Sequence, residues 1–397
     1  GKDIFAHTGS NFIDALFSVP FQTVFGYPGF QPWFVLAVLL GNAYSFRYLM
    51  RGLLKSPYAV WGATVLWLIN PYVLFEIQTG RITQAFLWFL PLAFACFLQV
   101  DRGGNKAAIW AGVWTALQAW TYWFMGWFMA LAFGWIAYTQ WREHNDNRRK
   151  LVKHWVVAGL TCLIVISPAL WAMSDLVSEQ SVPGVVESTG LFELPQVLGN
   201  NVSQQLHGWI TTEMMGFPLF RQWFWGAAAL LTVLASPGRF RWGGVMLFSM
   251  LFAIGPHLRV GDGVPMWNYL VAFHTVPFLS RLWFPYRLIV MAFFAVCVAM
   301  GLVMDRWVSQ RSEKTGRMFL LVPLLAATLG LAEQVVRGGY PLHARELRKP
   351  AVYEAMKDAP GGIIELPMMV ARVSLIWQPI HGQPLFGGMG ENAPIFW

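Results

Sequence analysis

Long apolar stretches recur along the whole chain, and they constrain its fold more than any other feature of the sequence. A helix needs about 20 apolar residues to cross the hydrocarbon of a bilayer. Stretches near that length lie at 32–50, 57–75, 83–99, 107–121, 125–140, 154–173, 222–236, 242–256, 283–304 and 318–333. The sequence therefore predicts an all-α polytopic membrane protein with about ten transmembrane helices, in which 107–140 is alternatively one broken or re-entrant segment.

The composition excludes a soluble globular protein, a disordered chain, a collagen and a disulfide-rich secreted domain. Only 12% of the residues are charged, whereas soluble domains average about 25%. The chain has 22 Trp and 31 Phe, which suits a membrane protein with aromatic residues at both interfaces. The three cysteines, Cys96, Cys162 and Cys297, all lie in apolar stretches. We expect them to be packing residues, without a disulfide or a metal.

Basic residues fall mainly in alternate connections between the apolar stretches. Fifteen of the 28 Lys and Arg residues lie there: Arg51, Lys55, Arg102, Lys106, Arg142, Arg148, Arg149, Lys150, Lys153, Arg239, Arg241, Arg306, Arg311, Lys314 and Arg317. Cytoplasmic loops are enriched in Lys and Arg, so this bias predicts that the basic connections lie on the cytoplasmic side of the membrane and the others on the exterior side. The net charge of +8 follows from the same pattern and from attraction to anionic lipid, and does not indicate nucleic acid.

This topology predicts three parts. Residues 1–31 form an exterior loop whose 11–25 stretch suits a helix in the interface plane. Residues 32–333 form the transmembrane bundle, with an exterior loop at 174–221. Residues 334–397 form an extracytoplasmic segment in which a small α/β piece begins, with a β-like run at 363–366. Because an exterior N-terminus without a signal peptide normally follows a span, we expect at least one transmembrane helix before Gly1.

Polar residues at membrane depth are costly and therefore mark candidate sites. Glu76, Arg81 and Gln84 lie in a short exterior turn between two spans. An arginine in that turn can bind a phosphate through two parallel hydrogen bonds. The alternative is that Glu76 and Arg81 pair with each other and cap the turn.

A second candidate group surrounds the start of the span at 283–304. Arg281 lies at its exterior mouth, Arg287 about one turn deeper, and His274 just before them. Two guanidinium groups near one depth suggest an anchor for a pyrophosphate or a lipid phosphate. The alternative is that these side chains extend along the lipid toward the head groups.

Exterior carboxylates supply the candidate general bases. Asp3 and Asp14 lie in the N-terminal stretch, where either can act on an acceptor hydroxyl or be an ordinary solvated carboxylate. His381 lies in a turn from which its side chain could bind a sugar; the alternative is that this segment is an ordinary turn. The chain has no Walker loop, HExxH, GxSxG or Asp-x-Asp motif. The sequence therefore identifies no cofactor, and binding of a divalent metal remains an alternative.

The order of short motifs resembles a family. Asn42 lies inside the first span, and Asn70-Pro71-Tyr72, Gly80-Arg81-x-x-Gln84 and Leu90-Pro91-Leu92 follow; Pro277-Phe-x-x-Arg281-x-x-x-Pro285-x-Arg287 and Ile364-Glu365-Leu366-Pro367 come much later. This order is similar to that of bacterial membrane proteins related to the GT-C class of integral-membrane glycosyltransferases. The resemblance implies a polyprenyl-phosphate sugar donor and a catalytic acid in the first exterior loop. Asp3 fits that role best, with Asp14 in reserve.

The leading hypothesis is a membrane glycosyltransferase at the exterior face of a bacterial inner membrane, with periplasmic N-terminal loop and C-terminal segment. Its partners are then a lipid-linked sugar donor, membrane lipids and other membrane proteins. Two alternatives stay open. One is a transporter or flippase of a lipid-linked glycan, which needs polar residues through the whole bilayer. The other is a non-catalytic subunit of a larger membrane assembly.

Overall fold

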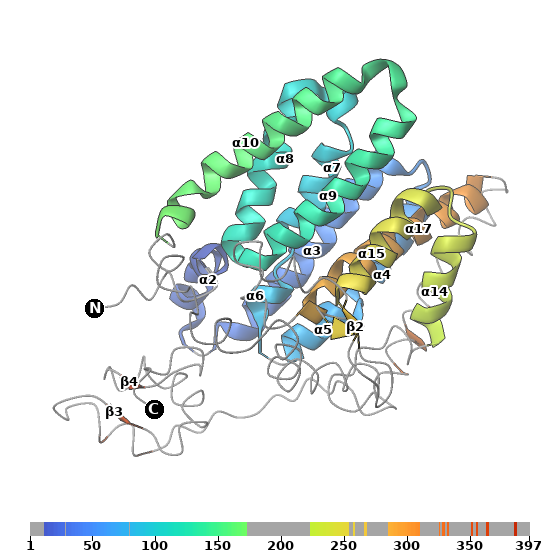
Figure 1. Cartoon of the computed structure of the whole chain (residues 1–397). Helices are drawn as coiled ribbons and strands as arrows, with labels where there is room; N and C mark the ends of the chain where they lie inside the picture. Colours follow the sequence, from blue (N-terminus) through green and yellow to red (C-terminus); the bar gives the residue numbers. More distant parts are fainter. Residues whose placement is uncertain are drawn as a thin grey trace. The chain divides into compact units, whose positions relative to one another are not determined.

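The computed structural model describes the chain as two compact units, Gly1–Pro341 and Leu342–Trp397. In the first unit the described residues are mainly helical (Figure 1). The structure describes residues 12–27, 29–78, 80–172, 223–253, 257–258, 266–267, 285–309, 325, 328–329, 332, 351, 355, 363–364 and 385–386.

The helices follow the predicted apolar stretches closely, although several are interrupted. They are α2 (Phe12–Phe25), α3 (Gln31–Leu53), α4 (Pro57–Leu68), α5 (Pro71–Gln78), α6 (Ile82–Ala85), α7 (Phe89–Phe97), α8 (Val100–Thr121), α9 (Trp123–Glu143), α10 (Arg148–Ala172), α14 (Trp223–Leu234), α15 (Gly244–Ala253) and α17 (Ile289–Ser309). Short turns of other helix types are η1 (Asn145–Asn147), the π-helical η2 (Arg239–Gly243) and η4 (Pro285–Leu288).

Two small sheets occur among the described residues. β1 (His257–Leu258) pairs with β2 (Met266–Trp267) in antiparallel fashion. In the second unit, β3 (Ile363–Ile364) pairs with β4 (Leu385–Phe386) in parallel. β3 falls within the run for which the sequence predicts a strand, whereas the α/β piece around it stays a prediction.

Four helices of the described part are long and apolar enough to cross a membrane. They are Gln31–Leu53, Pro57–Gln78, Arg148–Trp171 and Ile289–Ser309. The chain is thus a helical protein suited to a membrane, and ten spans remain a prediction. α8 and α9 have sufficient length, but polar residues, Trp and Tyr reduce their hydropathy. The predicted span at 318–333 lies almost entirely outside the described residues.

The segment 107–140 consists of two helices that meet at one residue. Tyr122 adopts an extended conformation between α8 and α9, with φ −144° and ψ 111°. At their other ends, Nε2 of His144 lies 3.9 Å from Oδ2 of Asp101, so the two helices form an antiparallel hairpin. α10 packs along α8 (Figure 1), and Gly112 allows this close approach because a Cβ there would meet the Ala158 carbonyl oxygen.

A buried asparagine holds the break between α6 and α7. Asn42 of α3 donates from Nδ2 to the Ala85 carbonyl oxygen at 2.8 Å. Its Oδ1 accepts the Leu87 N–H at 2.9 Å. Backbone groups that leave a helix within a membrane must find partners, since lipid offers none. The amide of Asn42 therefore replaces two of the helical hydrogen bonds that the break removes.

Gln118 of α8 completes this replacement from the opposite side. Its Nε2 donates to the Phe86 carbonyl oxygen at 2.7 Å. Its Oε1 accepts the N–H groups of Phe89 and Leu90 at 3.2 Å and 3.1 Å. The side chain is completely buried. One glutamine thus satisfies three backbone groups of the interrupted helix.

Gln118→Leu should lower the free energy of unfolding by about 2 kcal/mol, because it leaves buried backbone groups without partners. Chemical denaturation in one detergent measures this loss. Gln78→Leu is the matched control, since Gln78 is an exposed amide at the end of α5. Equal stability of the two variants would show that water or other groups replace the Gln118 amide.

The long helices separate two groups of polar residues. Arg287 lies just before α17, and Asp305 lies near the far end of that helix. Tyr122 follows α8, and Asp101 lies in its first turn. The 21 residues of α17 measure about 30 Å, close to the thickness of the hydrocarbon core. We call the two groups of helix termini the Glu76 end, which includes Arg287 and Tyr122, and the Asp305 end, which includes Asp101.

Side-chain contacts join several loops at the Asp305 end. Oδ1 of Asp305 accepts the backbone N–H groups of Lys55 at 3.1 Å and Ser56 at 2.7 Å. These contacts cap the N-terminus of α4, where a carboxylate is favourable. Arg241 pairs with Glu143 in the same region. All these loops belong to the basic set that the sequence assigns to one side.

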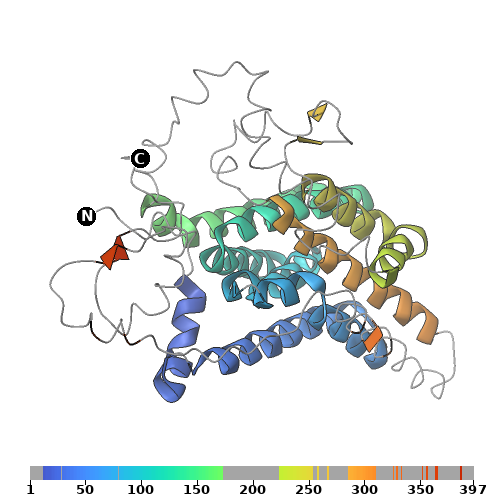
Figure 2. The same ribbon diagram turned by 90° about the horizontal axis from the view of Figure 1, so that it is seen from below.

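The first half of α2 turns two polar residues toward the protein, and several apolar residues of the helix are exposed. α2 forms the helix predicted for the 11–25 stretch and runs at a steep angle to α3 (Figure 2). Asp14 and Ser18 are buried, whereas Leu16 and Val24 are more than half exposed. This distribution is typical of a helix in contact with lipid, because polar residues then face the protein interior.

Candidate functional site

An asparagine–proline pair positions the first acidic residue of the Glu76 end. Oδ1 of Asn70 accepts the Val73 N–H at 3.0 Å, and its Nδ2 donates to the Trp67 carbonyl oxygen at 2.6 Å. Asn is a favoured N-cap, and Pro71 suits the first helical position because its missing N–H is not needed there. The pair ends α4, restarts the chain as α5 and thereby fixes the side chain of Glu76.

Glu76 and Arg81 form an ion pair across the turn that follows α5. Gly80 adopts a φ of +76°, which favours glycine and reverses the chain. Nε of Arg81 then donates to Oε2 of Glu76 at 2.5 Å, and the Arg81 N–H donates to the Glu76 carbonyl oxygen at 2.8 Å. The carboxylate of Glu76 is fully buried. The pairing alternative from the sequence is therefore the observed arrangement.

Arg287 reaches the same carboxylate from the start of α17. Its Nε lies 3.9 Å from Oε1 of Glu76, and its Nη1 donates to the Tyr122 hydroxyl at 2.6 Å. Only 8% of Arg287 is exposed. The alternative in which Arg287 extends along the lipid is thus wrong, because its guanidinium group is buried and contacts Glu76 and Tyr122 within the protein.

Among the described residues, two arginines, Arg81 and Arg287, contact the carboxylate of Glu76. In addition, Nη2 of Arg81 is buried and has no hydrogen-bond partner among the described residues. A buried donor without a partner is costly, and a phosphate oxygen is a strong acceptor for a guanidinium group. This group can therefore bind an anion beside the ion pair.

Asp14 lies next to this group and is not a solvated carboxylate. Only 8% of the residue is exposed. The Thr83 hydroxyl, two residues from Arg81, donates to Oδ2 of Asp14 at 2.6 Å. Oδ1 is buried and has no hydrogen-bond partner in the described part of the chain.

The carboxyl group of Asp14 is adjusted by two opposing effects. Burial raises its pKa above the ordinary value, and the hydrogen bonds from Thr83 and from the Asp14 and Ala15 backbone oppose that rise. A general base works best when its pKa is close to the working pH. The raised pKa and the unpaired Oδ1 together make Asp14 a suitable proton acceptor.

The structure brings together some of the residues that the sequence predicts for the site. Arg81 and Arg287 both contact Glu76, and Asp14 accepts a hydrogen bond from Thr83, two residues from Arg81 along the chain. Gln84 is half-buried in α6, where its N–H donates to the Arg81 carbonyl oxygen. The remaining predicted residues lie outside the described part of the chain: Asp3, His274, Arg281 and His381.

Tyr122 and Thr83 are site residues that the sequence analysis does not single out. Tyr122 stands in an aromatic-rich joint without charges, where its neighbours are also large rings. Its only sequence signal is its place between two helical stretches. Thr83 lies between Arg81 and Gln84 in the turn, and its partner Asp14 is 69 residues away. Neither hydroxyl belongs to a local catalytic pattern.

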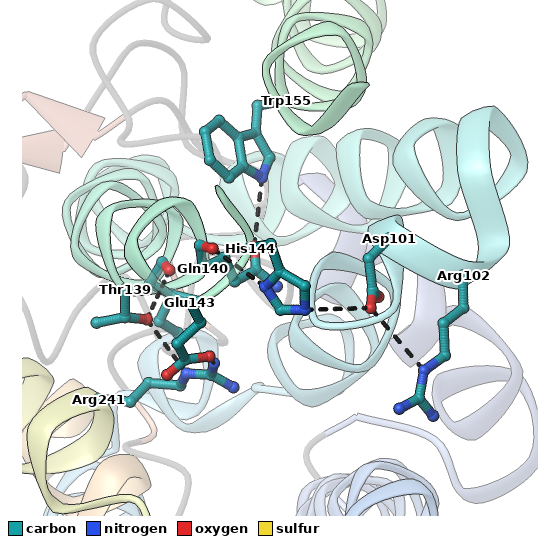
Figure 3. A network of polar contacts seen from close by, with 9 residues as sticks. Asp101, Arg102, Thr139, Gln140, Glu143, His144, Trp155 and Arg241 are labelled. Carbon is teal, nitrogen blue, oxygen red and sulfur yellow. Dashed lines mark hydrogen bonds and ion pairs between the residues drawn. The ribbon is translucent and has the colours of Figure 1, made fainter. Parts of the chain in front are cut away.

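A second polar network lies at the Asp305 end (Figure 3). Arg241 pairs with Glu143 and also donates to the Thr139 hydroxyl at 3.2 Å. Nδ1 of His144 lies 3.1 Å from the Gln140 carbonyl oxygen. These side chains pair with one another across α9 and η2, so the network connects helices. Among the described residues, no group of three or more His, Cys, Asp or Glu is arranged to bind a metal.

Comparison of this chain with protein-family models, curated proteins and solved structures found no match. The function of the Glu76 end is therefore argued from its own geometry. That geometry comprises the buried carboxyl of Asp14 with an unpaired oxygen and the partly exposed guanidinium of Arg81 with a buried, unpaired nitrogen.

Proposed function

We propose that the chain transfers a sugar from a polyprenyl-phosphate-type donor to an acceptor hydroxyl at the Glu76 end. The observation that carries this proposal is the pair of unsatisfied buried atoms, Oδ1 of Asp14 and Nη2 of Arg81. Thr83 connects the two residues within one short turn. A proton acceptor beside an anion-binding donor is what displacement of a phosphate by a hydroxyl requires.

The proposed step is a single inverting displacement. The carboxylate of Asp14 accepts the proton of the acceptor hydroxyl while the oxygen attacks the anomeric carbon of the sugar. The bond between that carbon and the phosphate oxygen breaks, and its electron pair leaves with the polyprenyl phosphate. Arg81 and Arg287 stabilise the negative charge that develops on the leaving phosphate. Glu76 holds both guanidinium groups in place.

The apolar face of α2 provides a surface for the lipid chain of the donor. Phe12, Leu16 and Val24 are about half exposed or more, next to the buried Asp14. Lipid that packs on this face has its phosphate near the turn that carries Arg81. The arrangement supports a donor that enters from the bilayer rather than from water.

A transfer assay tests this proposal. Membranes from cells that produce the full chain should convert a radiolabelled polyprenyl-phosphate hexose into a product that organic solvent no longer extracts. Arg81→Gln should reduce this conversion at least about tenfold, because it removes the phosphate donor group. Arg102→Gln is the matched control, since the Arg102 side chain is 90% exposed at the Asp305 end. Absence of any conversion with hexose and pentose donors would refute the proposal.

A lipid-glycan flippase is the second candidate, and the interrupted helices favour it. Transporters often contain discontinuous helices at their binding sites. Here α4 and α5 are interrupted at Asn70, and α6 and α7 at 86–88. The transfer assay separates the two functions, because a flippase moves the labelled donor across liposomes without breaking its sugar–phosphate bond.

The orientation required by the proposal can be tested by labelling. Gln78 and Asp146 are both exposed, at the Glu76 end and the Asp305 end respectively. In a chain whose native cysteines are replaced, Gln78→Cys should react with an impermeant thiol reagent in intact cells. Asp146→Cys should react only after permeabilisation, because the basic loops face the cytoplasm. The reverse pattern would place the site on the cytoplasmic side.

Thr83→Val should move the acid limb of the pH–rate profile to higher pH. A general base must be deprotonated, so activity falls as the pH drops through the pKa of Asp14. The Thr83 hydrogen bond lowers that pKa, and its removal therefore raises it further. Thr23→Val serves as the control, because Thr23 is an exposed residue of α2 that bonds only its own helix. An unchanged acid limb in Thr83→Val would remove Asp14 from the proton transfer.

A further inference from the structure

Arg47 places a charge inside a candidate membrane span, without a counter-charge among the described residues. It lies six residues before the end of α3, or about 9 Å along the helix. Its guanidinium carbon lies 4.3 Å from the centre of the Trp61 ring, a cation–π contact with α4. Its Nε is buried and has no hydrogen-bond partner, and no ion pair involves it among the described residues.

Asp305 contacts the residues that follow α3 and is already engaged there. Asp305 uses Oδ1 to accept the backbone N–H groups of Lys55 and Ser56, just after α3 ends. It caps α4 and forms no ion pair with Arg47 in the described structure. The described residues thus leave the charge of Arg47 uncompensated, which is unusual at membrane depth and points to an external partner.

The neighbours of Arg47 form one outward stripe along α3. Tyr44, Arg47, Tyr48 and Arg51 follow the spacing of a single helix face. Tyr44 and Tyr48 are 73% and 56% exposed, and Arg51 is also exposed. Trp61 of α4 borders the stripe and is 45% exposed. The stripe therefore presents two guanidinium groups one turn apart, two hydroxyl groups and an indole to the surroundings.

We propose that this stripe binds the phosphate of an anionic phospholipid at the Asp305 end. Two guanidinium groups one helical turn apart can bind phosphate oxygens on different sides, and tyrosine hydroxyls can donate to those that remain. Exposed Trp and Tyr favour the region of the lipid head groups. Basic pockets between membrane helices on the cytoplasmic side are known to suit anionic lipids. This site is independent of the transfer proposed for the Glu76 end.

Native mass spectrometry of the delipidated full chain tests the site. With dioleoylphosphatidylglycerol as the probe, the intact protein should bind the lipid, and Arg47→Gln should weaken that binding about tenfold. Arg51→Gln should weaken it by a similar factor. Because Arg51 is exposed, this second variant tests the site even if Arg47→Gln fails to fold. Arg102→Gln, another exposed arginine at the same end, should bind like the unaltered chain.

Two further titrations identify the source of the phosphate. Dioleoylphosphatidylcholine should bind at least about tenfold more weakly than the glycerol lipid, since its head group has no net charge. Inorganic phosphate at millimolar concentration should compete only slightly, because it lacks the acyl chains. Equal binding of both lipids, or equal losses in the Arg47 and Arg102 variants, would overturn the proposal. Full competition by inorganic phosphate would also overturn it and indicate a soluble anion site.

Discussion

Asp14→Asn is expected to lower the rate of sugar transfer at least about a hundredfold while the affinity for the donor stays nearly unchanged. The substitution keeps the size of the side chain and its contact with Thr83, but an amide cannot accept the acceptor's proton. A loss in kcat with little change in donor binding is the pattern for an interaction made only in the transition state. Radiolabel transfer gives the rate, and donor titration in the absence of acceptor gives the affinity.

Two other carboxylates serve as comparisons for this result. Asp146→Asn alters an exposed residue at the Asp305 end and should leave transfer unchanged. Asp3→Asn tests the residue that the family resemblance favours as the base. If Asp3→Asn abolishes transfer and Asp14→Asn does not, the base is Asp3 and the buried carboxylate of Asp14 has another role. Loss of donor binding in Asp14→Asn would make that residue a structural anchor instead.

Glu76→Gln should lower the free energy of unfolding by about 3–5 kcal/mol, because removal of one partner leaves buried charge uncompensated. Glu76 is fully buried between two arginines, so the variant exposes Arg81 and Arg287 to mutual repulsion. Denaturation of the full chain in a single detergent, followed by its tryptophan fluorescence, measures the loss.

The Asp305 end offers a matched control for this effect. Glu143 also pairs with an arginine, Arg241, but half of its side chain is exposed. Solvent screens such a pair, and Glu143→Gln should cost no more than about 1 kcal/mol. Similar losses for the two variants would mean that water reaches Glu76, and the argument for an anion site beside the buried ion pair would then fail.

The sequence predicts the positions of the helices well but not how many of them cross a membrane. Apolar stretches mark where helices form, and the structure has helices in each described stretch. Hydropathy does not reveal where a helix is interrupted. The break at 86–88 depends on amides from Asn42 and Gln118, which lie far away in the sequence. Only tertiary packing shows that such a break is stable at depth.

The sequence predicts only part of the candidate site, because contacts between distant segments leave no local pattern. Glu76 and Arg81 are close in sequence, so local spacing is enough to suggest a shared turn. The sequence marks Arg287 as a polar residue at membrane depth but does not predict its contacts with Glu76 and Tyr122. The contact between Asp14 and Thr83 joins segments without any shared pattern. Its prediction would need knowledge of which face of α2 the protein covers.

The cap that Asp305 provides for α4 has a consequence for biosynthesis. The residues it joins, Lys55 and Asp305, are 250 positions apart. At about 5–20 residues per second, a ribosome needs roughly 10–50 s to cover that distance. During this interval the two residues that precede α4, Lys55 and Ser56, have emerged without their carboxylate partner. The N–H groups between α3 and α4 therefore lack this partner until α17, one of the last described helices, has been synthesised.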